Sequence, residues 1–77
     1  MKKYYLVRTE EGENILVVCA EGLDLGEKGA ENWVRNRFHV HTTDEITKEE
    51  ADRARVDDVW EVNNRQTYNI LTGNYSW

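Results

Sequence analysis

The chain has 77 residues, of which 39% are hydrophobic and 32% are charged, and its formal net charge is -5. This length excludes more than one domain, and we expect a single domain over residues 1–77. The single cysteine, Cys19, excludes the disulfide-stapled class of small secreted proteins. The excess acid lies between Asp44 and Glu61, and a sequence pI of about 4.9 disfavours direct binding of DNA or RNA.

Two β-rich runs open the chain, Tyr4 to Thr9 and Ile15 to Ala20. The polar loop between them contains Gly12, which can adopt the positive φ of a short hairpin, so we predict a β-hairpin. The second run is apolar on both faces and is typical of a central strand. Cys19 lies inside it, and we interpret it as a small buried hydrophobic residue.

The N-terminal residues lack the long apolar stretch and the small-residue cleavage site of a signal peptide. The longest apolar run, Ile15 to Ala20, is far shorter than the roughly 20 residues that cross a bilayer. We therefore expect a cytoplasmic protein that makes no contact with membranes.

Gly22 to Gly29 has the composition of a connection rather than of a phosphate-binding loop, because no Lys-Ser or Lys-Thr pair follows its glycines. From about Ala30 the pattern becomes helical. Trp33, Val34 and Phe38 continue one apolar face from Ala30. We predict a main amphipathic helix that begins there and contributes its aromatic side chains to the core.

His39 and His41 flank one valine, so in an extended segment both imidazoles would face the same side. Such a pair could bind a metal ion, with Cys19, Asp44 or Glu45 as the third ligand. The alternative is that both histidines are solvated at the end of the preceding helix, where its dipole favours their charge.

A second, short helix is predicted within Ile46 to Arg55. Thr47 is a good N-cap, and Glu50 follows it by three residues, which is the spacing of a capping box. Ile46 and Ala51 occupy the positions of a hydrophobic staple. Little of this acidic helix would contact the rest of the domain, so most of its surface would be in water.

The C-terminal part predicts a second hairpin. Val59 to Val62 and Thr67 to Leu71 both alternate, and Asn63 and Asn64 can form the turn between them. The predicted fold class is therefore α+β: a small single domain of two β-hairpins, with a main helix and a short acidic helix between them and a mixed or antiparallel sheet. The expected core residues are Leu6, Val17, Trp33, Val34, Phe38, Trp60 and Ile70, and either face of the first strand could be the one that faces the core.

The sequence shows no catalytic set. Its one serine, Ser76, lies in the C-terminal tail, and paired carboxylates carry little information among fifteen acids. We expect a protein that is not an enzyme and needs no cofactor. The alternative function is that of a homo-oligomeric structural or accessory protein, possible as a homodimer, because Tyr5, Tyr75 and Trp77 could pair across a two-fold axis.

The acidic segment suggests a protein partner. Carboxylates along a helix and its flanks can imitate phosphates and bind a basic groove that normally holds nucleic acid. The residues predicted to bind such a partner are Asp44, Glu45, Glu49, Asp52, Asp57 and Asp58. The alternative is that these acids form a solvated face that keeps the protein soluble.

In its short length, its acidity and its Ile46 to Asp52 helix start, the chain resembles the small accessory proteins of phages and mobile elements, including the anti-CRISPR inhibitors. This resemblance is one of general character, and no single motif carries it. It implies a stoichiometric inhibitor of a host complex that handles nucleic acid.

Overall fold

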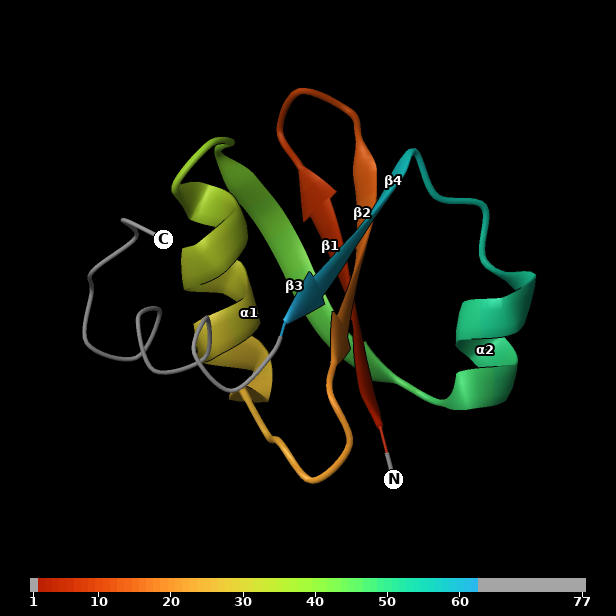
Figure 1. The fold of residues 1–77 in the computed structure, drawn as a ribbon. Coiled ribbons are helices and arrows are strands. Elements are labelled where there is room, and N and C mark those ends of the chain that lie inside the picture. The colour runs from red at the N-terminus through yellow and green to blue at the C-terminus, as the bar shows by residue number, and fades with distance from the viewer. Residues whose placement is uncertain (1, 63–77) are drawn as a thin grey trace.

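The computed structural model describes residues 2–62, which form one four-stranded sheet and two helices (Figure 1). The elements in chain order are β1 (Lys3–Thr9), β2 (Asn14–Cys19), α1 (Gly26–Arg35), β3 (Val40–Ile46), α2 (Lys48–Arg53) and β4 (Asp58–Val62). The strand order is β3-β1-β2-β4, and α1 and α2 lie on opposite sides of the sheet (Figure 1). The predicted α+β class is confirmed, and the sheet is mixed.

The first hairpin is confirmed. β1 and β2 pair antiparallel from Lys3↔Cys19 to Arg8↔Asn14, and Gly12 in the turn has a φ of 90°. β2 has the predicted central position, because β1 flanks it on one side and β4 on the other.

The second half of the sheet differs from the prediction. β3 was not expected at all, and it pairs antiparallel with β1. β4 is the first strand of the predicted second hairpin, but it pairs with β2 in the parallel direction. The other strand of that hairpin, Thr67 to Leu71, lies outside the described residues.

Strand alternation divides the apolar side chains between two clusters. The main core lies between the sheet and α1, and it consists of Tyr5, Val7, Ile15, Val17, Cys19, Leu25, Ala30, Trp33, Val34, Val40 and Val62. A smaller cluster lies under α2 and consists of Leu16, Val18 and Ala51, with Tyr4, Ile46 and Val56 packed against it. β2 therefore contributes to both clusters, as a strand that is apolar on both faces should.

The predicted core is largely confirmed on the α1 side. Val17, Trp33 and Val34 are buried, and Phe38 and Trp60 are half-buried against them. The rings of Trp33 and Trp60 meet edge to face, with centroids 5.3 Å apart.

Leu6 was wrongly assigned to this core. It is half-buried and lies opposite Leu16, so its side chain is on the α2 side of the sheet. Ile70 lies outside the described residues.

Both helices occur, with boundaries that differ from those predicted. α1 begins at Gly26, four residues earlier than expected, and ends before Phe38. α2 has the predicted capping box: the Thr47 hydroxyl accepts a hydrogen bond from the Glu50 N–H, and the Glu50 carboxylate accepts one from the Thr47 N–H, both at 3.1 Å. Within α2 only Ala51 is buried, so this helix is anchored by its cap and by one small side chain.

Candidate functional site

The six acids predicted to bind a partner come from three parts of the fold, and all are exposed. Asp44 and Glu45 lie in β3, Glu49 and Asp52 lie in α2, and the remaining pair, Asp57 and Asp58, lies at the start of β4. The contacts that each carboxylate already makes decide which of them are available to a partner.

Two of these carboxylates form ion pairs within the domain. Glu45 meets the Lys3 Nζ at 3.3 Å, and Asp52 meets the Lys48 Nζ at 3.0 Å, one turn along α2. The bond to Asp52 raises the pKa of Lys48. All four side chains are well exposed, so each pair contributes little to stability and could exchange for a contact with a partner.

The two aspartates at β4 have structural roles. The Asp57 carboxylate accepts a hydrogen bond from the Asn14 N–H at 2.8 Å, which joins the start of β4 to the start of β2. Asp58 accepts from the Val59 N–H at 2.9 Å and from the Trp60 Nε1–H at 3.0 Å. These hydrogen bonds give both aspartates a role within the fold, so no partner protein is needed to explain them.

The carboxylates of Asp44 and Glu49 make no hydrogen bond or ion pair with any other part of the chain that the structure describes. Asp44 lies opposite Leu6 in the ladder, so its side chain is on the α2 side, as Glu49 is. Glu61, opposite Val18, projects from the same face. These three carboxylates, all from the acidic segment, therefore lie on the α2 side of the sheet.

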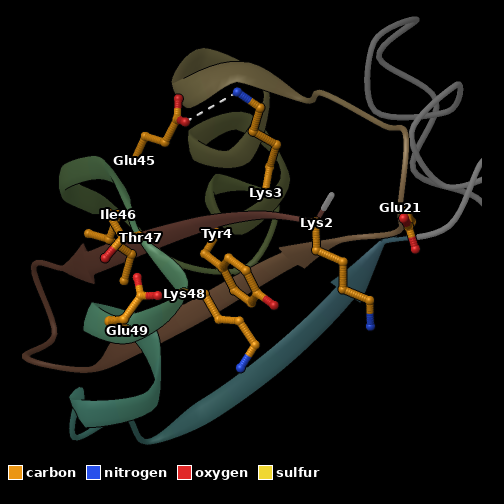
Figure 2. Close-up of a pocket in the computed structure, with 9 residues that line it drawn as sticks. All are labelled: Lys2, Lys3, Tyr4, Glu21, Glu45, Ile46, Thr47, Lys48 and Glu49. Carbon is orange, nitrogen blue, oxygen red and sulfur yellow. Dashed lines mark hydrogen bonds and ion pairs between the residues drawn. The ribbon is translucent and has the colours of Figure 1, made fainter.

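A hollow of about 730 Å³ opens on this side, where the start of β1 meets the end of β3 and the start of α2 (Figure 2). We call it the α2 hollow. Its lining residues are Lys2, Lys3, Tyr4, Glu21, Glu45, Ile46, Thr47, Lys48 and Glu49. Figure 2 shows the Tyr4 ring beside Lys48, whereas Lys3 points to the other side of β1, where it meets Glu45. Tyr4 and Ile46 give the hollow its apolar surface.

The α2 hollow is lined by three lysines and three glutamates, but these side chains differ in whether they are already held in ion pairs within the domain. Of its three lysines, Lys3 and Lys48 are held in ion pairs. Glu49, at the α2 end, has no such partner among the described residues. A cationic group that enters at this end would meet an unpaired carboxylate beside an apolar wall.

The two histidines of the predicted metal pair are both exposed, His39 just before β3 and His41 within it. Cys19, one of the proposed third ligands, is fully buried in β2, and burial raises the pKa of its thiol. Its interpretation as a buried hydrophobic residue is confirmed. Within residues 2–62, no group of three or more histidine, cysteine or acidic side chains could hold a metal ion.

The predicted oligomer contact of Tyr5 is wrong, because its side chain has no exposed surface. Strand alternation turns Tyr5 toward α1, where its hydroxyl donates a hydrogen bond to the Asp24 carboxylate at 2.7 Å and accepts one from the Gly26 N–H at 3.1 Å. Burial, and then the bond to Asp24, raise the pKa of this hydroxyl. The other two aromatic residues, Tyr75 and Trp77, lie outside the described residues.

Sequence reasoning missed the link from Tyr5 to Asp24 and the α2 hollow. The alternation of Tyr4 and Tyr5 was a usable signal, because neighbouring strand residues face opposite sides and the two tyrosines must have different surroundings. The pairing of Tyr5 with Asp24 depends on the path of the loop before α1, which no local pattern specifies.

Comparison of the chain with protein-family models, with curated proteins and with solved structures finds no match. Neither helix in residues 2–62 is long and apolar enough to cross a membrane.

Proposed function

We propose that the protein is a non-enzymatic binding module that holds a basic segment of a partner protein against its α2 side. The observation that carries this proposal is the α2 hollow, in which the apolar side chains of Tyr4 and Ile46 lie beside the unpaired carboxylate of Glu49.

A lysine or arginine side chain matches this combination. Its aliphatic stem can pack on Ile46 and on the Tyr4 ring while its charged head reaches the carboxylate. Asp44 and Glu61 extend the negative charge across the same face of the sheet. Fixed negative charge of this kind speeds the encounter with a basic surface and selects against acidic ones.

The partner class that we propose is a nucleic-acid-handling complex, which the module would inhibit stoichiometrically by occupying a basic groove. Carboxylates can stand where phosphates would bind. For this role we retain Asp44, Glu49 and Asp52. We omit Glu45, because it lies opposite Tyr5 in the ladder, so its side chain is on the α1 side, where it pairs with Lys3. We omit Asp57 and Asp58, because their carboxylates hold the start of β4.

The test compares partner capture by two charge-reversed variants. Glu49→Lys replaces the negative charge at the α2 hollow by a positive charge, whereas Glu11→Lys makes the same change in the exposed β1–β2 turn. The tagged proteins are used to capture partners from bacterial lysate at about 50 and 500 mM salt, which spans the range of strong and weak screening.

We expect the wild type and Glu11→Lys to recover the same basic protein at low salt, and Glu49→Lys to recover at least roughly tenfold less, as loss of a well-placed charge contact predicts. Equal recovery by both variants would show that the α2 hollow does not bind the partner.

A further inference from the structure

β3 lies at an edge of the sheet. Its inner side pairs with β1, and no other strand in the described part of the chain pairs with its outer side. An exposed strand edge presents unpaired N–H and C=O groups to which a further strand can add. This edge lies beside α1, and only its end, at Glu45 and Ile46, reaches the α2 hollow.

A side chain from α1 already accepts a hydrogen bond from one backbone N–H on the outer side of β3. The Glu27 carboxylate accepts a hydrogen bond of 2.9 Å from the Glu45 N–H. Residues of an antiparallel edge strand point their backbone groups alternately inward and outward. The Glu45 N–H therefore points outward, and so does that of Thr43, two residues earlier. Glu27 takes the place that a carbonyl of a fifth strand would have.

The same edge contains polar atoms without partners. The hydroxyl oxygens of Thr42 and Thr43 are shielded from solvent, and neither makes a hydrogen bond within residues 2–62. Both residues line a groove of about 480 Å³ between β3 and α1, together with Glu27, Lys28, Glu31, His41 and Asp44. We call it the edge groove. A strand added here would bring backbone groups within reach of these hydroxyls.

The charge of the edge groove selects its occupant. Among the lining residues Glu27, Glu31 and Asp44 outnumber Lys28. Glu31 is paired with Lys28 at 3.1 Å and with Arg35 at 3.2 Å, which leaves Glu27 and Asp44 as the acids with no ion pair within residues 2–62. A second copy of the chain, added about a two-fold axis at Thr43, would bring two sets of these acids together, and each copy has a net charge of -5. A segment rich in lysine or arginine would instead meet opposite charge on the strand and on the helix.

We propose that the outer edge of β3 binds an extended, basic segment of another protein as a fifth strand. Its backbone bonds to Thr43 and displaces Glu27 from the Glu45 N–H, and the released carboxylate then pairs with a basic side chain of the segment. Backbone bonds supply the affinity of such strand addition, and alternate side chains supply its specificity. Asp44 is shared with the function proposed for the α2 side, but the outward backbone groups of Thr43 and Glu45 are not, so the two proposals can fail separately.

The probe is an end-blocked octapeptide of alternating lysine and valine, titrated into the isotopically labelled protein and followed by backbone amide NMR shifts. We expect the largest shifts at Thr43 and Glu45. A peptide N-methylated on the bonding side should bind roughly fivefold more weakly for each backbone bond that it loses. A peptide with glutamate in place of lysine should not bind.

Two variants test the site from the protein side. Thr43→Pro removes the outward N–H without removing a bond to β1, a change that edge strands tolerate, and it should abolish binding. If this variant does not fold, Asp44→Lys supplies the test, because it places a cation on an exposed position of the edge and should weaken binding at least roughly tenfold. Glu11→Lys, in the exposed β1–β2 turn, should bind the peptide as the wild type does.

Three results would overturn the proposal. They are shifts centred on Tyr4 and Ile46 instead of Thr43, unchanged affinity in a folded Thr43→Pro variant, and no shift at peptide concentrations up to about 1 mM. A dimer in light scattering that Thr43→Pro converts to a monomer would assign the edge to a second copy of the chain instead.

Discussion

The hydroxyl of Tyr5 gives the sharpest test of how this small domain is held together. It joins the centre of the sheet to the loop that leads into α1, through Asp24 and Gly26. Tyr5→Phe keeps the buried ring and removes only this hydroxyl. The Gly26 N–H keeps a partner, because it also donates to the Asp24 carboxylate at 3.0 Å.

We expect the loss of this buried hydroxyl to lower the free energy of unfolding by about 1 kcal/mol, the typical net contribution of one hydrogen bond. In a domain of this size that loss lowers the melting temperature by roughly 4–8 °C. The matched control is Tyr4→Phe. Tyr4 is half-buried on the other side of the same strand, and its hydroxyl bonds to nothing in residues 2–62, so its removal should leave the melting temperature almost unchanged.

The effect should also depend on pH. The hydrogen bond from Tyr5, and then the one from Gly26, hold the pKa of the Asp24 carboxyl below its ordinary value. A carboxyl with a lowered pKa in the folded state stabilises the protein fully above its unfolded pKa of about 4, and that contribution is lost as the pH falls through the folded value. The stability difference between the wild type and Tyr5→Phe should therefore be largest near neutral pH and should narrow below about pH 4.

Thermal unfolding by circular dichroism, repeated from neutral to acidic pH, measures both effects. Equal melting temperatures for Tyr5→Phe and Tyr4→Phe at neutral pH would refute the role of the hydroxyl. A difference in melting temperature between the wild type and Tyr5→Phe that stays constant down to the lowest pH would refute the role of the Asp24 carboxylate. The effect of the substitution would then have a steric cause.

Two further predictions concern the helices. Thr47→Ala removes the acceptor of the α2 capping box and should cost about 1 kcal/mol, whereas Thr47→Ser should not; equal melting temperatures for the two variants would contradict the role of the cap. Gly29→Ala would place a Cβ 2.8 Å from the Leu25 Cγ, and an overpacking cost of about 1–3 kcal/mol exceeds the helix-propensity gain of about 1 kcal/mol, so the variant should melt at a lower temperature. In a Leu25→Ala background, which lacks the γ carbon, Gly29→Ala should no longer lower the melting temperature. A Gly29→Ala variant that melts higher than the wild type would show that the Leu25 side chain moves aside freely.

The sequence predicted correctly the elements that are specified by residues close together in the chain. The first hairpin has two β-rich runs and a turn glycine, and α2 has its capping box. The start of α1 could not be predicted, because Gly26 and Gly29 are poor helix formers. Gly29 is required there by the close approach of the side chain of Leu25, the N-cap residue four positions earlier, which helix propensity does not specify.

β3 was missed because it is an edge strand. Its burial is confined mainly to Val40 at one end, and most of its other residues are polar, so the apolar alternation of a half-buried strand is absent. The charge of the candidate site could be predicted, but the availability of each acid could not. That property depends on distant groups, such as Lys3 for Glu45 and the Asn14 N–H for Asp57.

The parallel pairing of β2 with β4 sets the order in which the domain can be completed. β1, β2 and β3 join through antiparallel contacts that become available once residue 46 has been synthesised. β4 pairs with β2 only after the chain has passed through α1, β3 and α2, and closing so long a loop slows the step. Until Val62 leaves the ribosome, one side of the central strand has no neighbour. During synthesis the nascent chain therefore has a second open edge, at β2, until β4, the final strand of the described residues, pairs with it.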